Sequence, residues 1–365
     1  MKLFHIDSNH EKKLNINQND NRNIDNLLQE KLNKHKETIS NYKSKWDMYK
    51  KNTNIYEYVY TSNKSLSICN IFPISRSYFK IHEILNDLNI LDNLQNISIT
   101  CIAEAPGGFI ENILYNCENN DIDIKNIYGI TLKQESSPYW NSKILENNLI
   151  ELLYGVDDTG DICNIHNLND FVNKIKKNTC DLITSDGGID YSNDYNNQEQ
   201  DSYNFIYSEI LLALSIQKPG GTFILKVFDL FDYKSIQLLY LLYISYSDIY
   251  IHKPHTSRST NSEKYIVCKN YLKKDNIVEL LKSNYNQTIN IYISLLFIKN
   301  INIYNYIYVS NQIKIIINTI NNIKKNIKIN KPSNFQIKKS IEWCLKYKLQ
   351  INKFFIDSNK SFYHH

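Results

Sequence analysis

The chain has 365 residues, of which 42% are hydrophobic and 22% are charged, and these proportions are ordinary for a globular protein with a sizeable core. Its formal net charge of +4 is compatible with a nucleic-acid partner without demanding one. No apolar run is long enough to cross a membrane, the N-terminus lacks the apolar segment of a signal peptide, and the seven cysteines are scattered without a C-x-x-C pair. These features argue against a membrane protein, a disulfide framework and a cysteine-based metal site. They favour a reducing compartment, the cytoplasm or, as an alternative, the nucleus.

In chain order, residues 1–70 read as a polar N-terminal extension, loosely ordered or helical over 1–40 and packed from Trp46 onwards. Residues 71–271 alternate as βαβ units do and predict an α/β fold, a Rossmann-like open sheet of about seven strands. The expected strands are 97–103, 127–132, 149–154, 181–185, 221–228, 249–252 and 264–269, and two of the expected helices are 203–217 and 236–246.

Residues 272–365 read as a helical C-terminal extension. Its first part, 272–330, is rich in Ile and Asn and favours helices that pack on the core over a separate binding module. Residues 339–349 predict an amphipathic helix that docks on the core. The expected apolar face of this helix holds Ile341, Cys344, Leu345 and Leu349.

Rare residue types gather in the middle of a chain dominated by Asn, Lys, Ile and Tyr, a bias typical of an AT-rich coding sequence. All nine glycines lie between Gly107 and Gly221. Residues 105–109 read A-P-G-G-F, where a buried strand enters a turn and a helix begins. Small side chains let a ligand approach the backbone, and the first N–H groups of the helix are free to bind it. The turn matches neither a dinucleotide nor a P-loop motif, and an ordinary strand-to-helix turn is an equally good interpretation.

Two charged residues stand out in the predicted strands. Asp186 precedes two glycines at the carboxyl end of a strand, the edge at which open α/β sheets bind ligands, although Asp is also a common turn former. Lys226 lies within an apolar strand, where a lysine must reach solvent, find a partner or lose its proton. A desolvated lysine beside a second cation has a lowered pKa and can act as a base.

Two further segments carry polar candidates. Residues 253–265, KPHTSRSTNSEKY, combine hydroxyls, Asn and Arg258 in a way that suits phosphate and sugar contacts, although polar loops are common. This segment contains Glu263, at the start of the last predicted strand. Upstream, Lys80 stands one position off the apolar stripe of a predicted helix and, taken alone, reads as a surface lysine.

Taken together and in this order, these motifs resemble those of the FtsJ-like (RrmJ-type) ribose 2′-O-methyltransferases. The likeness spans roughly residues 71–270 and is strongest to the branch that acts on mRNA caps in eukaryotes and large DNA viruses. The matching segments are 75–85 (SRSYFKIHEIL), 105–109 (APGGF), 128–133 (YGITLK), 160–162 (GDI), 184–190 (TSDGGID), 220–231 (GGTFILKVFDLF) and 253–269 (KPHTSRSTNSEKYIVCK).

The resemblance implies methyl transfer from S-adenosylmethionine to the ribose 2′-OH of the first transcribed nucleotides of capped mRNA, without a metal ion. Capped mRNA and possible further capping enzymes are the implied partners. The implied catalytic tetrad is Lys80, Asp186, Lys226 and Glu263, with Lys226 as the candidate base. The implied cofactor-binding residues are Glu104, Ala105, Pro106, Gly107, Gly108, Phe109, Thr131, Asp161 and Asp186. The candidates for RNA binding are Arg76, Lys253, Ser257, Arg258 and Asn261, and those for stacking on a cap are Trp140, Tyr191 and Tyr195.

The chain departs from the family at two cofactor positions. Many members carry an Asp where Cys101 stands, and Glu104 is the nearest acid here. The second strand also ends without the usual ribose-binding acid, so Thr131 marks only the region 131–135. Two other functions stay open. One is an rRNA or tRNA ribose 2′-O-methyltransferase, although the segment 253–263 favours the cap branch. The other is a non-catalytic RNA-binding protein with a methyltransferase fold, which a missing tetrad residue would have favoured; none is missing.

Overall fold

Eight strands form one mixed sheet in the computed structural model, which describes residues 2–6, 12–16, 24–135, 137–188, 196–328, 331–353 and 355. Their order is β1-β8-β9-β7-β6-β3-β4-β5. The strands from β7 to β5 in this order are parallel, and β9, β8 and β1 add to them antiparallel. The bounds are β1 Leu3–Ile6, β3 Ile97–Ile102, β4 Ile124–Ile130, β5 Ile150–Leu153, β6 Cys180–Ser185, β7 Gln217–Val227, β8 Tyr246–His252 and β9 Lys264–Tyr271.

All seven predicted strands are present, and the predicted α/β fold class is confirmed. The central strands β3 and β6 are covered on both faces, which explains why they read as nearly continuous apolar runs. The eighth strand, β1, is not predicted from the sequence, because four residues in a polar segment show too little periodicity. It pairs with β8, so the N-terminal extension and the central region share one sheet. The predicted region boundaries at 70 and 271 stay predictions.

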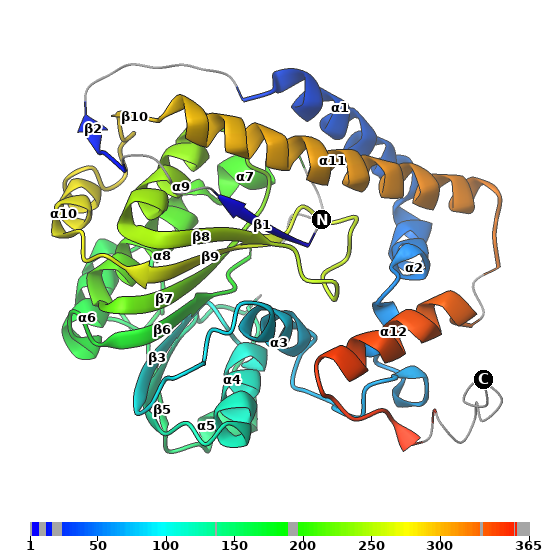
Figure 1. Ribbon diagram of the computed structural model, residues 1–365, viewed down its shortest axis with the longest axis horizontal. Coiled ribbons are helices and arrows are strands. Elements are labelled where there is room, and N and C mark those ends of the chain that lie inside the picture. The colour runs from blue at the N-terminus through cyan, green and yellow to red at the C-terminus, as the bar shows by residue number, and fades with distance from the viewer. Residues whose placement is uncertain are drawn as a thin grey trace.

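Helices cover both faces of the sheet (Figure 1). One face carries α6 (Ile165–Ile175), α8 (Tyr203–Ile216) and α9 (Tyr233–Ser245), and the other carries α3 (Ser77–Asp87), α4 (Gly108–Asn119) and α5 (Ser142–Leu145). The two predicted helices, α8 and α9, are confirmed. They are apolar nearly all round because the sheet covers one side and other helices cover the rest.

The extensions pack against each other along one side of the molecule, where the long helix α11 runs beside α1 (Figure 1). The predicted helices of 272–330 are present as α10 and α11, and none of the described helices is long and apolar enough to span a membrane. The remaining bounds are β2 Asn15–Ile16, α1 Asn26–Glu37, η1 Thr38–Tyr42, α2 Lys43–Thr53, η2 Glu57–Val59, η3 Lys64–Leu66, α7 Gln198–Asp201, α10 Asp275–Ser283, β10 Ile291–Tyr292, α11 Leu295–Lys324 and α12 Asn334–Lys346.

The predicted docking helix is present as α12, but it ends at Lys346, so Leu349 is buried beyond the helix, and Leu345 does not belong to the buried face. Cys344 is buried as expected, whereas Leu345 is 64% exposed. Trp343 is buried in its place, with its ring 5.8 Å from that of Phe79 on α3. The larger aromatic surface decides which face of α12 turns inward, because burying it removes more apolar area from water.

Candidate active site

Four charged side chains singled out from the sequence meet at one edge of the sheet. β6 and β7 are parallel neighbours, so Asp186, which follows β6, and Lys226, near the end of β7, lie at the same carboxyl edge. β9 runs antiparallel to β7, which brings Glu263, the residue before β9, to this edge as well. Lys80 reaches it from α3. The structure therefore brings all four residues of the predicted tetrad together.

The tetrad is arranged as two lysine–carboxylate pairs. Lys226 Nζ donates to the main-chain oxygen of Asp186 at 2.6 Å and lies 3.1 Å from its Oδ1. Lys80 Nζ donates to Glu263 Oε2 at 2.8 Å. Gly188 leaves room for the first pair, because a Cβ at this position would lie 3.0 Å from Lys226 Nζ. The four side chains are 10–15% exposed, so water screens the two pairs only weakly.

The pair of Lys80 and Glu263 is fixed in its charged form. Burial alone would lower the pKa of Lys80, but the carboxylates of Glu263 and Asp186 outweigh it and hold the pKa above its ordinary value. Burial would likewise raise the pKa of Glu263, yet the ammonium groups of Lys80 and Lys226 hold it well below its ordinary value. At neutral pH this pair therefore supplies oriented charges rather than a proton donor or acceptor.

Two hydroxyls orient the carboxylates of the tetrad. Tyr265 Oη donates to Asp186 Oδ1 at 2.8 Å, and Ser257 Oγ donates to Glu263 Oε1 at 2.7 Å. Burial raises the pKa of Tyr265 well above its ordinary value, which keeps the phenol a hydrogen-bond donor. The sequence reading predicts an RNA contact for Ser257 and no role for Tyr265. The two-residue period of strands could have found Tyr265, because it faces the same side of the sheet as Glu263.

A fifth ionisable side chain lies beneath the turn that carries Asp186. Glu209 on α8 is 1% exposed and accepts a hydrogen bond from Ser185 Oγ. The turn rests directly on it, because a Cβ added to Gly187 would lie 2.7 Å from Glu209 Oε1. Burial raises the pKa of Glu209 to about 8, so the carboxyl is mostly protonated at neutral pH. The available sequence signal for this residue was a lone carboxyl inside an apolar helix.

A cavity of about 1110 Å³ opens in front of the tetrad. It is larger than the roughly 300–1,000 Å³ of a typical site for one small molecule, so it has room for a cofactor and part of a larger substrate. The residues predicted from the sequence that line it are Ala105, Thr131, Asp161, Asp186, Lys226, Asn261 and Glu263. A further part of the wall comes from the N-terminal extension, with Lys36, Ile39, Trp46, Asp47 and Lys50.

One end of the cavity is shaped by the turn at Gly160. This residue has a φ of +72°, and a Cβ there would lie 1.9 Å from the main-chain oxygen of Thr131. Only glycine permits this approach, which sets Asp161 beside Thr131 in the wall. The Asp161 carboxylate accepts the main-chain N–H of Cys163 at 2.8 Å, and this bond fixes its position.

The A-P-G-G-F turn has packing roles that explain most of its residues. The buried carboxyl group of Glu104, whose pKa burial raises well above its ordinary value, accepts the N–H groups of Phe109 at 2.6 Å and Ile110 at 3.5 Å, and so caps α4. Gly108 lets α4 approach the start of α3, because a Cβ there would lie 2.2 Å from Ser75 Oγ. Ala105 is the residue of this turn that lines the cavity. The cofactor roles of Glu104, Pro106, Gly107, Gly108 and Phe109 stay predictions.

The two arginines predicted to contact RNA are held by one carboxylate of the N-terminal extension. Glu57 in η2 accepts two hydrogen bonds from Arg258, of 2.7 and 3.0 Å, and lies 3.5 Å from Arg76. Arg76 also donates to main-chain oxygens of Tyr56, Glu57, Tyr60 and Thr256. These bonds tie η2, α3 and the segment 253–263 together, and the RNA contacts of both arginines stay predictions.

Lys253, a third RNA candidate, is buried within the same segment. Its Nζ donates to the main-chain oxygens of Asn261, at 2.9 Å, and of Glu263. Burial lowers the pKa of Lys253 to about 7. The side chain thereby shapes the loop that leads into Glu263, and its contact with RNA also stays a prediction.

Comparison with known proteins gives this site a family. The sequence profile of the FtsJ-like methyltransferases matches residues 73–271, more than half of the chain. The chain belongs to the FtsJ-like methyltransferase family. The family predicted from the sequence motifs is therefore confirmed.

Curated relatives of this FtsJ-like chain include three with the name cap-specific mRNA (nucleoside-2′-O-)-methyltransferase 1. The relative from Dictyostelium discoideum is 35% identical over 213 residues, which cover 52% of this chain and 28% of that protein. The relative from Trypanosoma cruzi is 30% identical over 207 residues, which cover 54% of this chain and 57% of that protein. The relative from Mus musculus is 35% identical over 179 residues, which cover 46% of this chain and 20% of that protein. The matches thus span less than two thirds of each relative.

The aromatic residues predicted to stack on a cap do not line the cavity as far as the structure describes them. Trp140 is 8% exposed and belongs to the core of the FtsJ-like region, where its ring would lie 3.2 Å from a Cβ on Gly129. Tyr191 and Tyr195 lie outside the described residues.

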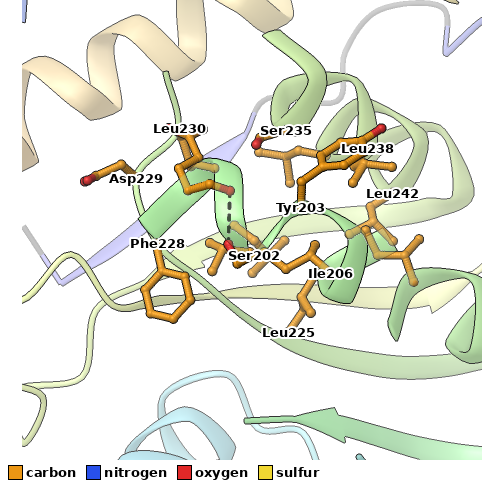
Figure 2. A pocket seen from close by; sticks show the side chains of 15 residues that line it. Ser202, Tyr203, Ile206, Leu225, Phe228, Asp229, Leu230, Ser235, Leu238 and Leu242 are labelled. Carbon is orange, nitrogen blue, oxygen red and sulfur yellow. Dashed lines mark hydrogen bonds between the residues drawn. The ribbon is translucent and has the colours of Figure 1, made fainter. Parts of the chain in front are cut away.

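A second cavity in the FtsJ-like region is too small to be a substrate site. Figure 2 shows it between α8, α9 and the end of β7, with Leu225, Leu238 and Leu242 among its mostly apolar lining. Its volume of about 20 Å³ is enough for a single water molecule. The cavity in front of the tetrad is therefore the better candidate for the place of reaction.

Proposed function

We propose that the chain transfers a methyl group from S-adenosylmethionine to the ribose 2′-OH of the first transcribed nucleotides of capped mRNA. The observation that carries this proposal is the shared cavity, in which Lys226, Asp186 and Glu263 face the same space as Thr131 and Asp161. A methyl donor and a nucleic-acid acceptor must meet in such a space. The names of the curated relatives support an mRNA cap as the acceptor.

The residues at one end of the cavity fit S-adenosylmethionine. Ala103, Ala105 and Gly160 have small side chains or none, so a flat ligand can lie close to the backbone. Asp161 and Asp186 add carboxylates to this wall, which suit a ligand that carries a sulfonium and an amino group. When bound, S-adenosylmethionine supplies an activated methyl group. The chain's own residues must then hold the acceptor and help to remove its proton.

Lys226 is placed to hold the acceptor oxygen. Two of the three N–H groups of its ammonium point to Asp186, which leaves one for a ribose 2′-oxygen. Holding this oxygen in line for attack supplies several kcal/mol. A neutral Nζ would instead accept the 2′-OH proton as a general base. Measuring the single-turnover rate against pH separates the two roles. If Lys226 acts as a base, the rate rises with pH until Nζ is neutral. If Lys226 only orients the oxygen, the rate does not rise in this way.

The experiment that tests the proposal is methyl transfer to three RNAs of one sequence, with m7GpppN, GpppN and 5′-phosphate ends. The expected product carries the label on the 2′-oxygen of the first transcribed nucleotide of the capped RNA. Transfer to a base nitrogen would contradict the proposal. Preferential transfer to uncapped rRNA or tRNA would support the alternative acceptor, and no transfer to any RNA would favour a non-catalytic RNA-binding protein. A cytoplasmic location and partnership with capping enzymes stay predictions.

A further inference from the structure

The N-terminal helices beside the cavity carry an excess of positive charge. Residues 26–53, which cover α1, η1 and α2, contain seven lysines and three acidic residues. Residues 295–346, which cover α11 and α12, carry a larger excess, with nine lysines and one acidic residue, but none of the described ones lines the cavity. A local positive field beside a substrate cavity attracts a polyanion.

One face of α2 directs this charge toward the cavity. Trp46, Asp47 and Lys50 line the cavity. On the same helix, Lys43 lies three residues before Trp46 and four residues before Asp47. Residues at this spacing share a helix face, so Lys43 stands one turn away on the cavity side. Lys43 is exposed, and the side chain of Lys50 is 18% exposed. Both ammonium groups are thus within reach of a ligand at the mouth of the cavity.

The helices that carry this face are firmly anchored. Lys36 of α1 is buried and its Nζ lies 2.5 Å from Asp229 Oδ2, in the loop after β7. On α2, Tyr49 Oη donates to the main-chain oxygen of Ile327 at 3.0 Å, and the hydroxyls of Thr53 and Thr319 are 2.8 Å apart. A wall that is already ordered loses little conformational entropy when a ligand binds.

The lysine face continues toward a residue predicted to contact RNA. Asn54, the C-cap residue of α2, donates to Glu57 Oε2 at 2.8 Å, and Arg258 Nε donates to the same oxygen at 3.0 Å, so Arg258 lies beside the C-terminal end of α2. Arg258 binds Glu57 through Nε and Nη2. Its Nη1 makes no bond to the part of the chain that the structure describes, and it remains available to a phosphate.

We propose that a basic track of Lys43, Lys50 and Arg258 binds the phosphates of the RNA strand next to the nucleotide whose ribose faces Lys226. The ligand is a single-stranded RNA backbone, held by charge and without reading of its bases. The inference rests on the proposed function, since it names the element that holds the same substrate. RNA binding measured without methyl transfer nevertheless tests it separately.

The test uses the full chain and a fluorescein-labelled capped RNA of about 20 nucleotides, with anisotropy followed from about 50 to 200 mM salt. The double variant Lys43→Ala/Lys50→Ala is expected to bind roughly tenfold more weakly at the higher salt. Its slope of log affinity against log salt should flatten by about 1.4, because each lost contact to a single strand removes about 0.7. The affinity for S-adenosylmethionine, measured by calorimetry, should not change.

Lys45→Ala is the matched control, because Lys45 lies on the same helix but contacts Asn326 at 3.0 Å, beyond the end of α11. Its salt slope should equal that of the wild type. Asp47→Asn should tighten RNA binding, because it removes the carboxylate that competes for Lys50. An unchanged slope in the double variant, or an equal loss in Lys45→Ala, would overturn the basic track. If these shifts appear but the wild type methylates no RNA, the proposed function fails and the track stands.

Discussion

The cavity in front of the tetrad has two walls that differ in origin and in charge. The FtsJ-like wall, from residues 73–271, carries four carboxylates, those of Asp161, Asp186, Asp201 and Glu263, and the ammonium group of Lys226. The helical wall, from α1, η1 and α2, lies outside the family match and comes from a segment with seven lysines and three acidic residues. Carboxylates suit a cationic methyl donor and lysines suit an anionic RNA. The proposed function and the proposed basic track therefore assign the reaction to the first wall and the hold on the acceptor to the second.

The largest effect is expected in the FtsJ-like wall. Lys226→Ala should lower the single-turnover rate of methyl transfer by about 10³-fold, because a positioned base or donor contributes roughly that much. Binding of S-adenosylmethionine should persist, and a rapid-quench assay with calorimetry measures both. Lys45→Ala in the helical wall is the control and should keep the wild-type rate at saturating RNA. A Lys226→Ala rate close to that of the wild type would remove Lys226 from the reaction.

The next effect concerns the join between the walls. Lys36→Met should lower the free energy of unfolding by about 3 kcal/mol, because it leaves the Asp229 carboxylate buried without its ammonium partner. Urea unfolding measures this change. The double variant Lys36→Met/Asp229→Asn removes both charges and should recover much of the loss. Equal losses in the single and double variants would show that packing, and not the ion pair, holds the helical wall in place.

Glu209, which is buried behind the FtsJ-like wall, contrasts with Asp229. Its hydrogen-bond partner is the neutral hydroxyl of Ser185, whereas Asp229 pairs with the ammonium group of Lys36. The Glu209 pKa of about 8 in the folded protein exceeds the ordinary value of about 4.3 in the unfolded chain. Between these pH values the folded protein retains a proton that the unfolded chain gives up, so the free energy of unfolding falls as pH rises. The loss approaches about 1.4 kcal/mol per pH unit.

Glu209→Gln keeps the acceptor for Ser185 and cannot ionise. Its stability relative to the wild type should therefore grow by about 3 kcal/mol from about pH 5 to about pH 7, as measured by urea unfolding at both values. Glu263→Gln is the matched comparison, because the pKa of Glu263 is lowered and its charge is stabilising at both pH values. A Glu209→Gln difference that does not vary with pH would contradict the raised pKa.

The sequence predicts the FtsJ-like wall more fully than the helical wall, and the reason is physical. Asp186, Lys226 and Glu263 stand at or near the ends of predicted strands, and the topology of the sheet brings such ends together without further information. The helical wall is polar, and its burial depends on α11, which follows it by more than 200 residues. The hydrogen bonds from Arg258 to Glu57 join residues 201 positions apart. No periodicity within a short segment reports contacts of this kind, so the sequence predicts only a loosely ordered or helical arm over residues 1–40.

The smallest effect tests whether the two walls divide the work as described. Tyr265→Phe removes the hydrogen bond to Asp186 and keeps the ring, whose centroid lies 6.1 Å from that of Phe109. A hydrogen bond to a charged group contributes roughly 1.5–3 kcal/mol, so kcat should fall about tenfold through the misplaced Asp186–Lys226 pair. The KM for RNA should stay constant, because the helical wall holds the strand. If the KM rises while kcat is unchanged, Tyr265 acts on RNA binding, and binding and reaction do not separate between the two walls.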